Sequence, residues 1–151
     1  MPSEDFVAPA LVTLDEPPAE RRACIDFLLD LAVDAGRVTD RSAARDALLE
    51  REASTPTGLG NGVAVPHART DAVTAPTVAF ARSDRGVDFD APDGDPATLL
   101  FCLLAPEDAD EDHLEVLSRL SRSLADPAFR TRLAEADSER TVVDAIREAV
   151  A

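Results

Sequence analysis

The run TLLFCLL, from Thr98 to Leu104, is apolar at nearly every position and constrains the fold more than any other segment. A strand with one solvent face alternates apolar and polar side chains, whereas a strand covered on both faces is apolar throughout. The run therefore predicts a central strand with helices on both faces of its sheet. Further strands are predicted at 10–14, 63–65, 77–82 and 87–89, with a turn at Asp93-Gly94.

Helical patterns precede and follow these strands. Apolar residues spaced by three or four between 25 and 33 predict a first helix that Gly36 ends, and a second helix should run from Thr39 or Asp40 to about Glu52. Three helices are predicted later, from 111 onward, over 127–136 after the cap Asp126, and from 137 or 138 to the end. The order predicts a three-layer α/β/α sandwich, and 151 residues suit a single domain over 1–151.

The charge is strongly negative, at −15, and every basic residue is arginine. Such a chain is a poor partner for nucleic acid. Molar salt shortens electrostatic screening to ~3 Å and would relieve the self-repulsion, so the composition indicates a halophile's protein. An acidic protein from an organism of ordinary salinity remains the alternative. No apolar run approaches the ~20 residues that span a bilayer, and the first residues do not resemble a signal peptide, so we expect a cytoplasmic protein without membrane insertion.

His67 is one of two histidines and follows a glycine-rich turn and a short apolar strand, in the segment TGLGNGVAVPHART at 57–70. Pro66 has no N–H and fixes φ, so we expect the strand to end there, or to lie at an edge, and to present the imidazole. An ordinary histidine at a strand end is the plainer interpretation. A Gly-x-Gly-x-Gly turn is by itself a weak signal, and no lysine follows as a phosphate-binding P-loop would require.

The complete string is more specific. TGLGNGVAVPHAR resembles the active-site segment of enzyme IIA components of the sugar phosphotransferase system, in the fructose and mannitol class. The pair Arg51-Glu52, the stretch GVDFDAPDGDPATLLFCLLAPE and the pair His113-Leu114 occur in the same order as in that family. The resemblance implies a mixed sheet and a phosphoryl carrier that accepts from the protein HPr and donates to a cysteine or histidine of enzyme IIB, itself associated with the membrane permease IIC.

Carried over, His67 is the phosphoryl acceptor and attacks through Nε2. Phosphoryl transfer asks the protein for positioning and for cations at the phosphate oxygens. A neutral imidazole is a suitable nucleophile near pH 7, since its unperturbed pKa is ~6.5, provided that the other ring nitrogen is held as a donor. A backbone carbonyl can hold it, and the glycine-rich turn offers candidates.

Four residues are candidates for stabilising the phosphate: Arg51, His113, Thr57 and Arg69. Arg51 stands sixteen positions before His67 and His113 forty-six after it, separations like those of mannitol-type IIA domains. Arginine binds phosphate bidentately and stays charged. Plainer roles remain open: a solvated helix-end cation for Arg51, a surface residue for His113, a turn former for Thr57 and partner docking for Arg69. Arg69 shares a face with His67 only if the strand is regular there.

Two cysteines, Cys24 and Cys102, lie in apolar stretches and are expected to be core thiols. The sequence lacks metal-ligand spacings, so we expect neither a metal nor a cofactor. The leading function is a stand-alone IIA carrier for fructose or a related sugar. A nitrogen-type regulatory IIA, which binds targets according to its phosphorylation state, is the alternative. A non-catalytic module like the cytoplasmic domain of anion transporters is a third, which the intact Pro66-His67 disfavours.

Overall fold

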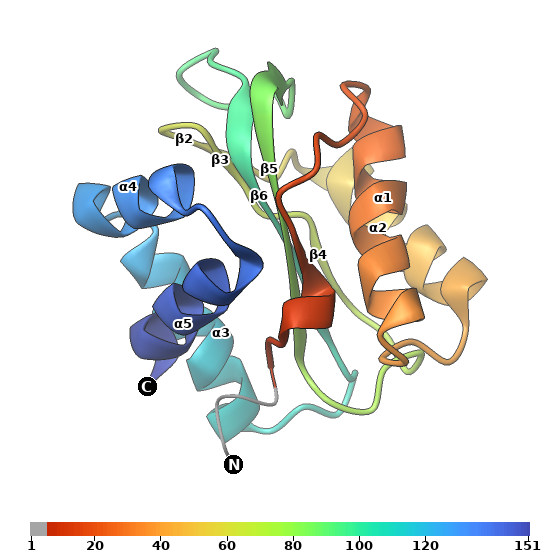
Figure 1. Cartoon of the computed structure of the whole chain (residues 1–151). Helices are drawn as coiled ribbons and strands as arrows, with labels where there is room; N and C mark the ends of the chain where they lie inside the picture. The colour runs from red at the N-terminus through yellow and green to blue at the C-terminus, as the bar shows by residue number, and fades with distance from the viewer. Residues whose placement is uncertain (1–5) are drawn as a thin grey trace.

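The computed structural model describes residues 6–151, apart from the side chains of Asp112 and His113. Within this range a six-stranded sheet stands between two layers of helices (Figure 1). Helices α1 and α2 cover one face, and α3, α4 and α5 cover the other. The predicted α/β/α sandwich with a mixed sheet is confirmed.

The elements follow one another with short connections. The helices are α1 (Arg21–Asp34), α2 (Arg41–Ser54), α3 (Glu111–Ser123), α4 (Pro127–Glu135) and α5 (Glu139–Val150). The strands are β1 (Val12–Thr13), β2 (Gly58–Gly60), β3 (Val63–Ala64), β4 (His67–Arg69), β5 (Thr77–Val87) and β6 (Ala97–Ala105). Side chains of Asp40, Asp126 and Ser138 cap α2, α4 and α5 by accepting backbone N–H groups, as their types predict.

Strand β6 is the centre of the sheet. The strand order is β1-β5-β6-β3-β2, and β4 also pairs with β6, beyond the end of β3. Strands β3 and β4 run parallel to β6, whereas β5 runs antiparallel to it. Phe101 and its odd-numbered neighbours pack against α3, α4 and α5, while Cys102 and its even-numbered neighbours pack against α1 and α2. The unbroken apolar run thus reflects burial on both faces.

Three strand predictions need correction. The predicted strand at 10–14 is a 3₁₀ turn over Pro9–Leu11 followed by the short β1, with Pro9 at the first position of the turn. The separate strands predicted at 77–82 and 87–89 are the single strand β5, which ends at Val87. The register to β6 shifts between Arg82 and Val87, so the polar residues between them form a bulge. Glu16 holds this bulge by accepting hydrogen bonds from Ser83 Oγ and Asp84 N–H.

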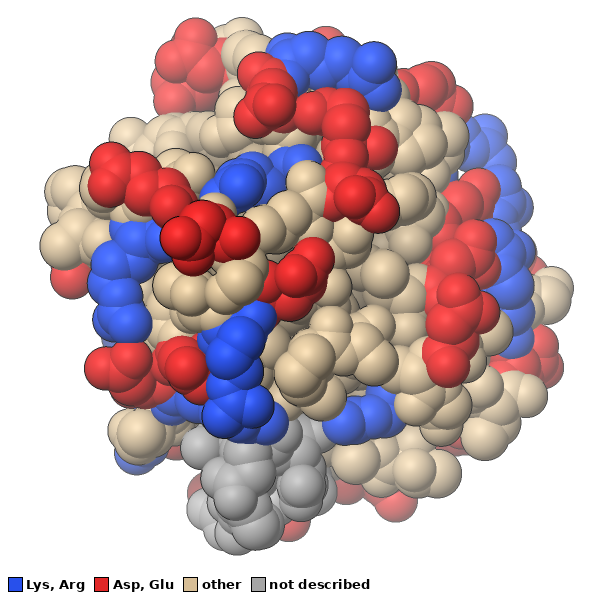
Figure 2. Space-filling view, in the orientation of Figure 1, with Lys and Arg blue, Asp and Glu red and all other residues tan. Residues whose placement is uncertain are grey.

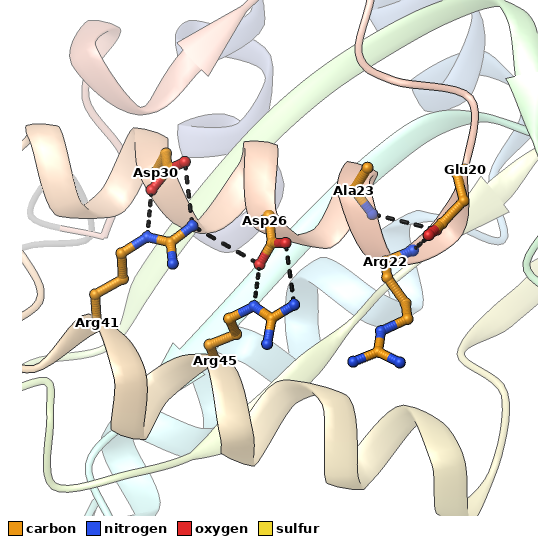
Figure 3. A network of polar contacts seen from close by, with 7 residues as sticks. All are labelled: Glu20, Arg22, Ala23, Asp26, Asp30, Arg41 and Arg45. Carbon is orange, nitrogen blue, oxygen red and sulfur yellow. Dashed lines mark hydrogen bonds and ion pairs between the residues drawn. The ribbon is translucent and has the colours of Figure 1, made fainter.

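Ion pairs join the two helices of one layer. Arg41 on α2 binds Asp30 of α1, with Nε 2.7 Å from Oδ1, and Arg45 binds Asp26 at 2.6 Å (Figure 3). Arg41 also lies 3.8 Å from Asp26, so the four side chains form a network. Such half-exposed ion pairs individually contribute little to the stability of the fold. Together they tie α2 to α1, and the far end of α2 carries Arg51.

Acidic and basic side chains interleave over the molecular face drawn in Figure 2. Cys24 and Cys102 are buried without a disulfide, and burial raises the pKa of both thiols to about 12. The prediction of core thiols is therefore confirmed. No helix in the described part of the chain has the length and apolarity needed to cross a membrane.

Candidate functional site

A hollow of about 550 Å³ lies where the end of α2, the strands β2, β4 and β6, and helix α3 meet. Its walls are largely apolar and include Leu103, Leu114 and Leu117. Polar groups enter it from His67, Arg51 and Arg69, and from two serines of α3. The hollow is therefore lined by residues from segments that are far apart in the sequence. The predicted nucleophile His67 and the predicted cations Arg51 and Arg69 are among them.

His67 is the first residue of β4 and is half-buried. Its Nδ1 lies 2.7 Å from the carbonyl oxygen of Val65. A carbonyl only accepts, so Nδ1 is the protonated nitrogen and the lone pair of the neutral ring is on Nε2. The predicted carbonyl support is present, but it comes from Val65, between β3 and Pro66, not from the glycine-rich turn. Only Pro66 stands between Val65 and His67 in the chain, so this contact is local.

Pro66 interrupts the sheet without ending it. Its missing N–H separates β3 from β4, as expected. Its carbonyl nevertheless accepts the N–H of Leu103 at 3.0 Å, which keeps the chain beside β6. Pairing then resumes with His67 opposite Leu103 and Arg69 opposite Ala105. The prediction that the strand ends before the imidazole is therefore confirmed, since β3 stops at Ala64, and the separate strand β4 continues along β6 after the proline.

Arg69 shares the face of His67, because β4 is regular and side chains two apart in a strand lie on the same side. Its side chain is exposed and borders the hollow. Arg51 enters from the last turn of α2, where its Nη1 donates to the carbonyl of Thr55 at 3.0 Å. Within the described residues no carboxylate forms an ion pair with either arginine. Arg51 and Arg69 therefore border the same hollow as the imidazole, and neither is held in an ion pair by a carboxylate of the described residues.

Thr57 also borders the hollow, but its hydroxyl donates to Glu52 Oε1, and the residue is buried. Its one hydroxyl proton is therefore engaged inside the protein, and its role here is to anchor the turn. His113 lies in the first turn of α3, next to Leu114, which borders the hollow. The side chain of His113 is outside the described residues, so its predicted role stays a prediction.

The glycine-rich turn is fixed from a second loop. Asp93 Oδ2 accepts the N–H of Asn61 at 2.9 Å, and Asn61 has a positive φ of 57°. The backbone N–H groups of Asn61 and Asp95 lower the pKa of Asp93, so this carboxylate stays ionised and bonded well below neutral pH. The 88–96 loop, of which only the turn at Asp93-Gly94 was predicted, thus supports the segment that leads to His67.

Glu52 does not line the hollow, but it contacts Thr57, which does, and the sequence did not predict this contact. It is only 7% exposed and binds both the N–H and the hydroxyl of Thr57. In the sequence, Glu52 is a glutamate near the end of a predicted helix. Such a carboxylate is ordinarily exposed to solvent, so nothing in the sequence indicated its burial. No cluster of three or more metal-ligating side chains occurs among the residues that the structure describes.

The chain is similar to known proteins in both sequence and fold. Residues 5–149 match the family described as "Phosphoenolpyruvate-dependent sugar phosphotransferase system, EIIA 2". The fructose-specific EIIA component of Haloferax volcanii is 59% identical over 140 residues, which cover 93% of this chain and 91% of that protein. The nitrogen regulatory protein IIA-Ntr of Neisseria meningitidis is 33% identical, with a TM-score of 0.86 over 95% of this chain and 97% of that one.

A third similarity concerns a complex. The IIA protein for mannitol from Escherichia coli, solved together with phosphorylated IIB, is 28% identical to this chain. Its TM-score is 0.79, over 94% of this chain and 97% of that one.

Proposed function

Because the chain belongs to the EIIA 2 family of the phosphoenolpyruvate-dependent sugar phosphotransferase system, we propose that His67 carries the phosphoryl group. The protein is a phosphotransferase component, and the family transfers phosphoryl groups from IIA to IIB. In our proposal phosphorylated HPr is the donor, and a IIB protein associated with the permease IIC is the acceptor. The similarity to the Haloferax component supports fructose, or a related sugar, as the transported substrate.

The observation that carries the proposal is the contact of His67 Nδ1 with the Val65 carbonyl at 2.7 Å. It leaves the lone pair on Nε2 at a residue that borders an open hollow. In the transfer, Nε2 forms a bond to phosphorus as the bond between phosphorus and the donor's leaving atom breaks. The Val65 carbonyl stabilises the Nδ1 proton throughout, because phosphorylation leaves the ring with its proton on that nitrogen.

Arg51 and Arg69 supply the positive charge that this chemistry needs. A phosphoryl group carries close to two negative charges at neutral pH, and the protein already has a net charge of −15. Guanidinium groups that are not neutralised by carboxylates can bind the phosphate oxygens bidentately. We propose that Arg51 stabilises the group on His67, with Arg69 and His113 as further contacts. No metal or cofactor enters the transfer.

Docking of the two partner proteins is proposed at the same hollow. Leu59, in β2, borders it and is 51% exposed, and it is the one large apolar side chain exposed among the described residues. Molar salt would screen long-range attraction between proteins, so apolar contact beside His67 favours partner binding under those conditions. Both partners would meet the protein in the cytoplasm, where we place it by this proposal.

The nitrogen-type alternative rests on the likeness to IIA-Ntr, whose fold matches with a TM-score of 0.86. The same histidine chemistry would then control target proteins according to phosphorylation. The identity of 59% to a fructose-specific component, against 33% to IIA-Ntr, favours the sugar branch.

The testing experiment incubates the protein, in molar KCl, with phosphoenolpyruvate, enzyme I and HPr, and then adds a fructose-type IIB. Intact mass should show one acid-labile phosphoryl group on the protein, which then moves to IIB. Uptake of label without transfer to any sugar-type IIB would favour the regulatory alternative. No label from a donor that is active toward another IIA would overturn the proposal.

Replacing Arg51 by alanine should slow phosphoryl acceptance roughly 10- to 100-fold, because a hydrogen bond to a charged group contributes about 1.5–3 kcal/mol. Rapid-quench measurement of a single turnover from phosphorylated HPr gives the rate. Arg22→Ala, which removes an exposed arginine from α1, is the charge-matched control and should react at the wild-type rate. Equal rates in the two variants would exclude a role for Arg51 at the phosphate.

A further inference from the structure

The carboxylate of Glu52 is buried at the end of α2, one residue after Arg51. Its Oε2 accepts the N–H of Thr57 at 3.0 Å, and its Oε1 accepts the hydroxyl of the same residue. Arg21 Nη1 lies 3.6 Å from Oε2. A buried carboxylate is costly unless it is paired and hydrogen-bonded. These three contacts satisfy it, and two of them hold a single residue, Thr57.

The hydrogen bonds continue from Thr57 to the imidazole. The carbonyl of Thr57 accepts the N–H of Val65 at 3.0 Å. The carbonyl of Val65 in turn faces His67 Nδ1 at 2.7 Å. Glu52 therefore holds Thr57, and Thr57 holds Val65 by its N–H. The carbonyl of Val65, in the next peptide group, faces His67 Nδ1 and determines which ring nitrogen carries the proton. The contact between Thr57 and Val65 spans the glycine-rich turn, and the other two links lie on either side of it.

Arg21 anchors the other side of this chain of contacts. Its Nε donates to the carbonyl of Asp88 at 2.9 Å, its Nη2 lies 3.1 Å from Asp90, and its guanidinium stands 5.6 Å from the centre of the Phe89 ring. The backbone at Gly58 packs against this loop so closely that a Cβ there would lie 2.8 Å from the Phe89 carbonyl oxygen. Glu52 is thus linked through Thr57 to the glycine-rich turn and through Arg21 to residues 88–90, and these two segments pack tightly against each other.

We propose that Glu52 is a positioning residue for phosphoryl transfer, which orients His67 and holds its Nδ1–H tautomer through Thr57 and Val65. The expected effect of Glu52 on phosphoryl transfer rests on the proposed function. The tautomer of His67 can be measured in the protein without any phosphoryl transfer. Glu52 does not touch the phosphate in this scheme. We call the contacts of Glu52 with Thr57 and Arg21 the Glu52 clamp. Because Glu52 adjoins Arg51 in the chain, this clamp also holds the end of α2 against the turn that precedes His67.

The variants Glu52→Gln and Thr57→Val test the clamp from its two ends. Glutamine offers one acceptor where the carboxylate offers two, and it cannot pair with Arg21. Valine keeps the shape of threonine but removes the hydroxyl. Glu50→Gln removes the same charge from an exposed position of α2 and is the matched control. Thr57→Ser restores the hydroxyl and should restore the wild-type behaviour.

Two readouts are needed. Long-range ¹H–¹⁵N NMR spectra report the tautomer of His67, assigned by comparison with His67→Ala, and single-turnover kinetics report phosphoryl acceptance. We expect both test variants to gain Nε2–H tautomer and to react about tenfold more slowly, which corresponds to about 1.4 kcal/mol. The double variant should be no slower than the slower single variant, because both act through one chain of contacts. Glu50→Gln should match the wild type in both readouts.

A purely structural clamp would lower the melting temperature and leave the tautomer ratio of the folded protein unchanged, and that result would overturn the proposal. Should Glu52→Gln fail to fold, Thr57→Val decides the question alone. If the wild-type protein accepts no phosphoryl group, the proposed function fails, while the tautomer shift still tests whether Glu52 positions His67.

Discussion

A His67→Ala variant should fold like the wild-type protein and take up no phosphoryl group from phosphorylated HPr. The half-buried ring makes its one described hydrogen bond to a neighbouring carbonyl, so its removal costs little stability. It removes the only atom proposed to bond to phosphorus, so the loss of acceptance is complete, whereas removal of a supporting charge only slows the reaction. Intact mass after incubation with phosphoenolpyruvate, enzyme I and HPr measures the result, and circular dichroism confirms folding.

The second histidine provides the matched control. His113→Ala should still be labelled, more slowly than the wild type, because we assign it a supporting role at the phosphate. Label on His67→Ala equal to that of the wild type would exclude His67 as the acceptor. If His113→Ala took up no phosphoryl group and His67→Ala still did, His113 would be the acceptor and His67 the supporting residue.

Replacing Phe101 by alanine should cost about 3–5 kcal/mol in the free energy of unfolding, the largest stability effect that we expect from a single substitution. Phe101 lies in the central strand β6, is fully buried and meets Phe80 edge to face, with ring centroids 5.0 Å apart. Small domains are stable by only about 5–15 kcal/mol, so the variant should lie near its unfolding threshold. Urea unfolding in molar KCl measures the change without varying ionic strength.

Phe27→Ala is the control, since it makes the same chemical change on α1 at a position that is only partly buried. Its loss should be clearly smaller. If both variants lost the same free energy, burial in the sheet would not explain the effect, and the central place of β6 in the core would be in question.

Local chemistry made much of the fold predictable. The apolar run at 98–104 indicated a strand covered on both faces, and alternate residues of β6 do pack into two separate clusters. Helix ends were predictable where a side chain caps its own helix, as Asp40 and Asp126 do. The single strand β5 was not predictable, because the polar residues of its bulge resemble a loop until Glu16, far away in the sequence, binds them.

The candidate site shows the same division. The glycine-rich turn and Pro66 indicated in the sequence that His67 is a candidate site residue. The separation of Arg51 from His67, like that of mannitol-type IIA domains, indicated Arg51 as a candidate phosphate-binding cation. The direction of Arg69 depended on whether β4 pairs regularly with β6, which is a long-range property. Thr57 was predicted either to contact the phosphate or to form the turn, and only the folded chain shows that its hydroxyl donates to the buried carboxylate of Glu52.

By itself, the sequence determined the layered fold and the family, and it singled out His67 as the proposed acceptor, because these depend on periodicity and on residue types at fixed spacings. Only the tertiary structure decided that the Val65 carbonyl holds Nδ1, that Arg51 and Arg69 border one hollow, and that Glu52 is buried beneath the turn. Those facts depend on which donors and acceptors meet once the chain is packed. A carboxylate or a carbonyl has the same local sequence signal whether it faces water or an imidazole, and its partners exist only in the folded protein.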